Sequence, residues 1–322
     1  MWPYVLRKLL YNIPVYLGIL LIVMVALRVN DPVWAHLGSK TRGTAGAQER
    51  YETKRTEMGL DRPFAAQYAA FVGQVATLDF DARSWDRPTE TVGAMLRRAI
   101  IPTLMITVPS LVLTTVISIC IGLVASYFRG GWADRTLMLL AVLGMSISYV
   151  VYIILGQYFA AYKLREWAGV ELFAIQGYEP GIANWPYYCL LPVLIGVVVA
   201  VGYDTRYYRA VMVEETTRDY IATARAKGAT KPRIMFVHML KNAMIPVISR
   251  VMISVPFLIE GSILLEFYFN IPGMGKTMIE AIIHKDFPVI QAFTAVLAGL
   301  FIVSNILTDV LYAWVDPRVR LS

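Results

Sequence analysis

The first residues that could carry chemistry form a short glycine-lysine-threonine run. Gly275, Lys276 and Thr277 match the end of a phosphate-binding loop, in which the lysine and the hydroxyl hold nucleotide phosphates and magnesium. The complete motif also requires a glycine at position 270, where this sequence has Asn270. We therefore expect the chain to have no ATP site of its own, and any use of ATP to need another subunit.

A second group of reactive residues lies inside long apolar runs. Arg250, Glu260 and Asp309 are charged, and charges in such runs are costly unless they face a protein interior or a water-filled path. Arg250 and Asp309 could pair or extend to the membrane surface. Alternatively, all three could line a translocation path. In a different class of protein, an ion-coupled secondary transporter, Glu260 or Asp309 would be the proton or ion site.

The remaining nucleophiles and metal ligands are scattered. His36, His238 and His284 have no carboxylate at ligand spacing, and Cys120 and Cys189 lie singly in apolar runs. No motif of a hydrolase or a membrane protease is present in the sequence. We predict no catalytic residue, no bound metal and no cofactor, so the chain is not expected to be an enzyme.

The elements that position these residues follow from the composition. Of 322 residues, 57% are hydrophobic and only 16% are charged, whereas a soluble domain carries about 25% charged residues. Six runs are long enough to cross a bilayer, which takes roughly 20 apolar residues. They are residues 9–27, 99–128, 136–162, 180–203, 242–265 and 287–308. We predict an all-α polytopic membrane protein, whose first span is a retained helix rather than a signal peptide because no small-residue cleavage site follows it.

Charge in the loops sets the predicted orientation. With the N-terminus inside, the cytoplasmic segments hold 14 Lys and Arg, against 4 in the short outer loops, which puts both termini in the cytoplasm. The whole chain has a net charge of +7, and the positive excess lies in the cytoplasmic segments, which face the inner surface of the lipid bilayer, so no nucleic-acid partner is needed to explain it. The predicted parts are residues 1–28 (first helix), 29–98 (outer segment), 99–315 (five-helix core with a loop at 204–241) and 316–322 (cytoplasmic tail).

The loop between the fourth and fifth spans has the most specific pattern. Residues 216–227 lack helix breakers, Gly228 stands where a left-handed helix cap would stand, and Thr230 with Pro232 suits the start of a second helix. Three interpretations compete: an amphipathic helix on lipid, a DNA-binding helix-turn-helix, and a docking helix for a cytoplasmic motor. The small residues on its face favour docking, because alanines bury little area in lipid and two flanking spans argue against DNA.

The residues of this loop also resemble a known family. The run from Asp219 to Gly228, followed by His238 and by Ile245-Pro246, closely resembles the EAA loop of ABC-importer permeases, in particular the peptide and nickel branch. The resemblance implies a coupling helix that docks into an ATP-binding subunit. Its candidate residues here are Thr217, Tyr220, Ile221, Ala222, Ala224, Arg225 and Gly228.

Further motifs extend the resemblance along the chain. They are Gly59-Leu60-Asp61-Arg62-Pro63, Gln67-Tyr68, Pro102-Thr103, Glu266, residues 271–275, Asp286 with Pro288, Asn305, Asp309, Tyr312 and Asp316-Pro317-Arg318. The sequence departs from the family at Ser148, where proline is common, and within the EAA motif itself, where Ala222 and Thr223 replace Glu and Ala. No salt bridge from position 222 to the ATP-binding subunit is therefore implied.

The resemblance implies one transmembrane permease subunit of an ATP-driven importer in the bacterial inner membrane. It would move oligopeptides or similar solutes by alternating access. The implied partners are a second homologous permease, two cytoplasmic ATP-binding subunits and an extracytoplasmic substrate-binding protein. Peptides, nickel chelates, opines and sugars all remain open as substrates.

Overall fold

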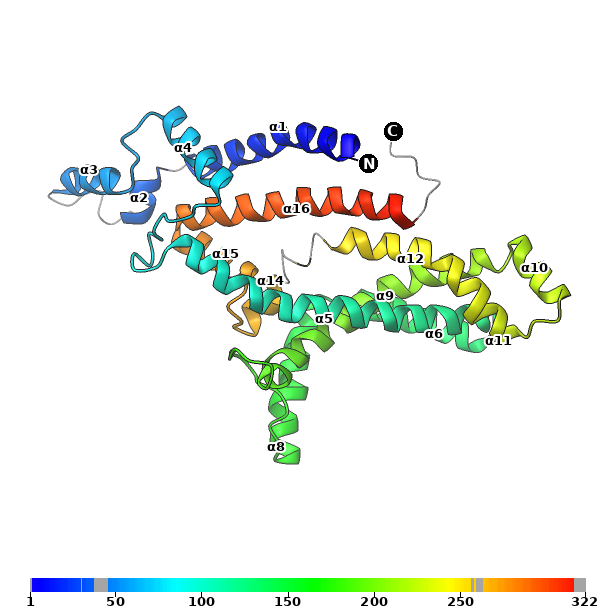
Figure 1. The fold of residues 1–322 in the computed structure, drawn as a ribbon. Helices are drawn as coiled ribbons and strands as arrows, with labels where there is room; N and C mark the ends of the chain where they lie inside the picture. The colour runs from blue at the N-terminus through cyan, green and yellow to red at the C-terminus, as the bar shows by residue number, and fades with distance from the viewer. Residues whose placement is uncertain (1, 30, 38–45, 256–257, 259–262, 316–322) are drawn as a thin grey trace. The chain divides into compact units, whose positions relative to one another are not determined.

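The chain folds into helices that form two compact units. The computed structural model describes residues 2–29, 31–37, 46–255, 258 and 263–315 (Figure 1). Helices make up 78% of the chain, and no β-strand occurs in these described ranges. Unit 1 contains the described residues within 1–101 and 272–307, and unit 2 contains those within 102–271 and 308–315. The all-α prediction is therefore confirmed.

Unit 1 combines two long apolar helices with short helices of the segment between the first two spans. Its helices are α1 (Trp2–Ala26), α2 (Pro32–Leu37), α3 (Ala47–Glu57), α4 (Phe64–Thr77), α15 (Met274–His284), the first turns of α5 (Val92–Tyr127) and most of α16 (Phe287–Val315). The pattern of residues 67–77 is that of a short amphipathic helix, and in the structure these residues belong to α4, which begins three residues earlier. Pro63 precedes it and fixes an extended entry, with φ −54° and ψ 142°.

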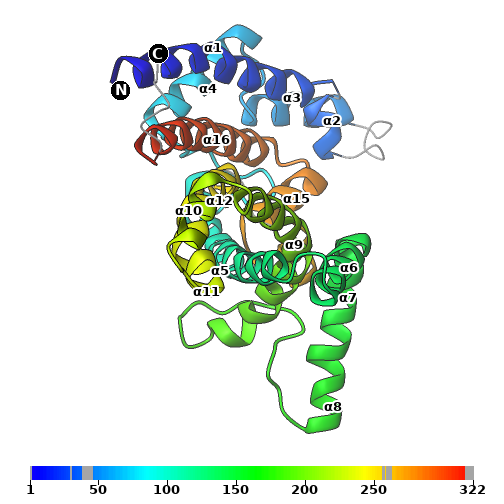
Figure 2. The same ribbon diagram turned by 90° about the vertical axis from the view of Figure 1, so that its right-hand side faces the viewer.

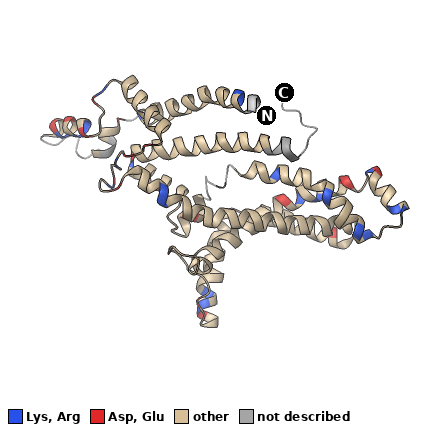
Figure 3. Cartoon of the chain, viewed as in Figure 1, with Lys and Arg blue, Asp and Glu red and all other residues tan. Residues whose placement is uncertain are grey.

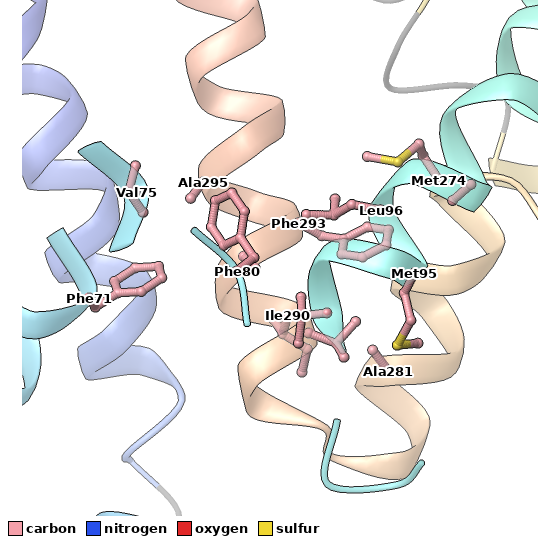
Figure 4. Packing of buried hydrophobic residues seen from close by; sticks show 14 of the residues in the cluster. Phe71, Val75, Phe80, Met95, Leu96, Met274, Ala281, Ile290, Phe293 and Ala295 are labelled. Atoms are coloured by element: carbon pink, nitrogen blue, oxygen red, sulfur yellow. The ribbon is translucent and has the colours of Figure 1, made fainter. Parts of the chain in front are cut away.

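The core of unit 1 joins residues that are distant in sequence. Phe71 of α4, Leu96 of α5, Met274 of α15 and Phe293 of α16 are all buried in one apolar cluster (Figure 4). Two hydroxyls connect the helices of this unit. Tyr68 Oη of α4 donates to the Leu17 carbonyl of α1 at 2.8 Å, and Tyr16 Oη of α1 donates to the Ala295 carbonyl of α16 at 2.8 Å.

A buried carboxylate fixes the loop that leads into α5. Asp286 is 2% exposed and accepts hydrogen bonds from the Ser84 hydroxyl, the Trp85 amide at 3.1 Å and the Asp86 amide at 3.3 Å. A buried carboxylate is tolerated when its oxygens are satisfied in this way. Asp286, one of the residues on which the family resemblance rests, thus attaches this loop to the start of α16.

Unit 2 is organised around one long helix. Its elements are the rest of α5, α6 (Trp132–Ser146), α7 (Tyr149–Gly156), the π-helix η2 (Gln157–Lys163), α8 (Leu164–Ala168), α9 (Trp185–Glu215), α10 (Asp219–Ala226), α11 (Lys231–Arg233), the π-helix η3 (Ile234–Met239), α12 (Leu240–Ser254) and α14 (Ile263–Tyr268). Helices α6, α7 and α12 all pack against α9 (Figures 1 and 2).

The third predicted span is not one continuous helix. Helices α6 and α7 meet at 91°, so the run at residues 136–162 is bent, and the bend lies at the segment where the sequence departs from the family at Ser148. Ile147 and Ser148 adopt extended ψ angles of 135° and 140°, and the Tyr152 hydroxyl donates to the freed Gly144 carbonyl at 2.8 Å. Five described helices are long and apolar enough to cross a membrane, or six if this bent pair is one span.

Two other spans differ from their expected limits. Helix α9 continues to Glu215, well beyond the apolar run that ended at residue 203, because no helix breaker follows. The run at residues 242–265 contains α12 and the first residues of α14, and its Pro256 lies outside the described residues.

Candidate functional site

The candidate site is the segment that leads from α9 through α10 and α11 into α12. Two threonine hydroxyls form hydrogen bonds to backbone carbonyls of the last turn of α9. Thr216 Oγ1 donates to the Val213 carbonyl at 2.6 Å, and Thr217 Oγ1 donates to the Glu214 carbonyl at 2.8 Å. Arg218 then adopts an extended conformation, with ψ 147°, and α10 begins at Asp219. The helix predicted at 216–227 is therefore shorter, because these threonines terminate α9 instead of starting α10.

One side of α10 is attached to the chain's own core. Ile221 is 2% exposed and Ala224 is 8% exposed, and both belong to a buried cluster with Tyr208 and Met212 of α9 and Met239 of η3. Burying an isoleucine side chain stabilises this contact by roughly 1.5–3 kcal/mol. Ile221 and Ala224 thus position α10 and do not form its outer surface.

Tyr220 adds a polar contact beside this apolar one. Its hydroxyl donates to the Glu215 carboxylate at the end of α9. Burial raises the pKa of Tyr220 to about 12, and the hydrogen bond to Glu215 acts in the same direction. The tyrosine is therefore a neutral donor at physiological pH, and it connects the end of α9 to the first turn of α10.

The opposite side of α10 is exposed. Thr217, Ala222, Arg225 and Gly228 are all accessible, and Arg225 forms no ion pair with any residue that the structure describes. Small residues beside a free guanidinium give a surface that another backbone can approach closely. Figure 3 marks both basic and acidic residues along the chain around α10 and α11.

Gly228 ends α10 with a left-handed cap, as the sequence predicts. Its φ is 78°, and two hydrogen bonds close the cap: the Gly228 amide donates to the Arg225 carbonyl at 2.9 Å and the Ala229 amide donates to the Ala224 carbonyl at 3.1 Å. This pair of bonds is the Schellman arrangement, which favours glycine because its backbone has no Cβ. The cap reverses the chain toward α11.

Helix α11 then returns to the end of α5. Thr230 is at its N-cap position, with Pro232 in the first turn, in agreement with the predicted second helix. Lys231 Nζ donates to the Tyr127 carbonyl at 2.9 Å and lies 4.1 Å from the centroid of the Tyr127 ring. The whole α10–α11 segment is therefore connected to α5 and α9, and it continues through η3 into α12.

The three residues considered for a translocation path have different positions. Arg250 of α12 pairs with Asp204 of α9, with Nε 3.2 Å from Oδ1. Asp309 is half-buried on α16. Glu260 lies outside the residues that the structure describes. The path made of these residues thus remains a prediction.

Two ion pairs of unit 2 were not anticipated. Besides Arg250 with Asp204, Arg209 of α9 binds Asp134 of α6 through two hydrogen bonds, Nε–Oδ1 at 2.5 Å and Nη2–Oδ2 at 2.6 Å. Recognising that α9 continues past Tyr203 would have placed Asp204 and Arg209 on a helix, where partners on α6 and α12 could be sought.

Comparison with known proteins assigns the family. Residues 118–321, which include α10, Gly228 and both ion pairs, match the family of the binding-protein-dependent transport system inner membrane component. The chain belongs to this family. It is also 32% identical over 324 residues to a Brucella ovis protein named as a peptide permease protein, with 100% of both chains covered.

Other relatives agree with this assignment. The glutathione transport system permease protein GsiC of Shigella flexneri is 32% identical, with 99% of each chain covered. An inward-facing structure of the MetNI methionine ABC transporter has the same fold, with a TM-score of 0.55 and 18% identity over 69% of this chain and 97% of the other. The chain is a non-catalytic inner-membrane permease subunit of an ABC importer, a family that works with ATP-binding and substrate-binding partners. The ion-coupled alternative is not favoured.

Proposed function

We propose that α10 is the surface through which this permease subunit receives the movement of its ATP-binding partner. The observation that carries the proposal is the two-sided nature of the helix. Ile221 and Ala224 fix it to the chain's own core, whereas Ala222 and Arg225 are exposed. A helix that is firmly attached on one side and open on the other can transmit a push to the spans that flank it.

The proposed assembly contains more than one chain. It consists of this subunit, a second homologous permease, two cytoplasmic ATP-binding subunits and an extracytoplasmic substrate-binding protein. Both termini and α10 would face the cytoplasm, because the basic residues gather in the segments on that side. The segment at residues 29–98 would then face the binding protein.

The proposed substrates are peptides or similar solutes. The names of the full-length relatives, a peptide permease protein and a glutathione permease, support this class. Closure of the ATP-binding subunits would move α10, and the attached α9 and α12 would move with it. The permease would thereby alternate between conformations open to either side, with Glu260, Arg250 and Asp309 as candidates for the path.

The test is a charge placed on the exposed side of α10. Ala226 is also exposed on α10. Ala226→Glu puts a bulky anion on that surface without touching the buried side, so it should reduce both co-purification of the ATP-binding subunits and substrate-stimulated ATP hydrolysis at least tenfold. Ala183→Glu, at an exposed turn before α9, is the matched control and should retain both. Equal assembly and ATP hydrolysis in the two variants would show that α10 is not the docking surface.

A further inference from the structure

Unit 1 contains a cavity that no part of the proposed coupling mechanism uses. Its volume is about 350 Å³, and its walls come from the ends of α1 and α16, from α4 and from the chain between α3 and α4. This volume is within the range of small-molecule binding sites. Gly59, Leu60, Arg62 and Gln67, which belong to the motifs noted in the sequence, all line it.

A partly buried guanidinium faces this cavity with one nitrogen unsatisfied. Arg28 Nη2 donates to Gln67 Oε1, and the guanidinium carbon lies 4.9 Å from the centroid of the Phe64 ring. Gln67 is itself oriented, since its Nε2 donates to the Arg62 carbonyl at 2.6 Å. Arg28 Nη1 is buried and has no hydrogen-bond partner among the described residues. The side chain is thus oriented but incompletely bonded.

The charge of the cavity wall is unbalanced. Arg28 and Arg62 both line the cavity, and the lining residues that the structure describes include no aspartate or glutamate. Burial lowers the pKa of the Arg28 guanidinium, which reflects the cost of an uncompensated charge in this place. A buried donor without a partner and a cation without a counter-ion are both costly. An anion in the cavity would relieve both costs.

The rest of the wall indicates what the anion is attached to. Phe71 is 7% exposed and Phe80 is 8% exposed, and both line the cavity together with Trp85. Such a wall suits an apolar group next to the anion. The planar guanidinium fork matches the geometry of a carboxylate, to which it can donate two parallel hydrogen bonds.

We infer that this cavity binds the carboxylate of a small solute that also carries an apolar group, with Arg28 as its main ligand and Arg62 as a second cation. An amino acid or the C-terminal residue of a short peptide has this chemistry. Only the placement of the cavity on the outer side of the membrane rests on the proposed function. A failure of carboxylate binding would leave the docking of α10 unaffected, so the two can be tested separately.

The test measures binding to the full-length chain purified in a neutral detergent. The probes are the dipeptide Ala-Phe and its C-terminal amide, which differ only in the carboxylate charge. Isothermal titration should show that the amide binds at least tenfold more weakly than the free acid. Arg28→Gln should weaken binding of the free acid at least tenfold, and the exposed Arg62→Gln should weaken it severalfold. Arg83→Gln, an exposed arginine that does not line the cavity, should bind like the unmodified protein.

Several results would overturn the inference. It fails if the acid and the amide bind equally, if neither binds at millimolar concentration, or if Arg28→Gln and Arg83→Gln bind the acid equally. It also fails if inorganic phosphate binds and Ala-Phe does not, or if Arg28→Gln changes only the anionic phospholipid that co-purifies. The comparison of acid and amide uses the unmodified chain, so it decides the question even if Arg28→Gln does not fold.

Discussion

Arg209 binds Asp134 through two hydrogen bonds, at 2.5 and 2.6 Å, and this pair joins α9 to the first turn of α6. The Asp134 side chain is 4% exposed and that of Arg209 is 27% exposed. The Gly130 amide also donates to Asp134 at 2.9 Å, so one carboxylate organises the turn between α5 and α6 as well. Arg209 lies on the last turns of α9, close in sequence to α10.

Asp134→Asn is expected to destabilise the chain. The substitution leaves the guanidinium without its charged partner. Breaking a fully buried ion pair costs about 3–5 kcal/mol. Because Arg209 is partly exposed, we expect a somewhat smaller loss of about 2–4 kcal/mol in the free energy of unfolding. Thermal unfolding in detergent measures it. Arg233→Gln is the control, because Arg233 is exposed and forms no ion pair with any described residue.

A double-mutant cycle isolates the pairwise contribution. Asp134→Asn combined with Arg209→Gln should cost clearly less than the sum of the two single substitutions, since either one alone already breaks the pair. Strict additivity of the two losses would mean that the side chains do not stabilise the fold through each other.

Gly228 is expected to tolerate asparagine better than alanine. Its φ of 78° is costly for residues with a Cβ, but asparagine adopts this conformation more readily. A Cβ placed on Gly228 would have no atom within 4 Å of it, so the cost is in the backbone alone. Gly228→Ala should cost about 1–2 kcal/mol, the cost of the left-handed conformation for a residue with a Cβ, and Gly228→Asn less. Substrate-stimulated ATP hydrolysis by the assembled importer should follow the same order, and equal effects would argue against the left-handed cap.

Tyr220 should make stability depend on alkaline pH. Its folded-state pKa, raised to about 12, exceeds the ordinary value of 10.0, so the folded state retains a proton that the unfolded state loses. This contribution is complete below pH 10 and is lost as the pH rises through 12. Tyr220→Phe should therefore reduce the fall in melting temperature between pH 10 and 12. An unchanged slope would show that another group is responsible.

The sequence predicts those features that depend on local chemistry. The left-handed cap at Gly228 and the start of α11 near Thr230 follow from backbone conformations that few residues adopt, and the apolar runs follow from the length of a membrane span. Contacts that depend on distant residues were not predictable in this way. The bend between α6 and α7 lies at Ile147 and Ser148, so no proline or glycine marks it in the sequence. The Gly144 carbonyl, which the bend frees, accepts a hydrogen bond from the Tyr152 hydroxyl.

The same limit applies to the candidate site. Alanine and isoleucine suit both a docking surface and a core, so the pattern of α10 did not reveal that Ile221 and Ala224 face the chain's own core. Arg250 was expected to need a partner, but Asp204 lay just beyond an apolar run and was assigned to a loop. Because α9 continues to Glu215, Asp204 lies on this helix, where it pairs with Arg250 of α12.

Gly202 allows α9 to approach α6, and this contact gives the last prediction. A Cβ at this position would lie 2.7 Å from the Ala141 carbonyl oxygen, a backbone atom that cannot move aside without shifting α6. Gly202→Ala should therefore cost about 1–3 kcal/mol, as other overpacked contacts do, although alanine is the better helix former. The measurement is thermal unfolding of the purified chain.

Gly18→Ala provides the matched control for this contact. Gly18 also lies inside a long apolar helix, α1, but nothing is within 4 Å of a Cβ built on it. Alanine there should leave stability unchanged or raise it by up to about 1 kcal/mol, because it favours the helix without a clash. If both substitutions stabilised the chain equally, α6 and α9 would not be in close backbone contact at Gly202. Opposite signs for the two would establish that this glycine sets the spacing between α6 and α9, the two helices that the Asp134–Arg209 pair joins.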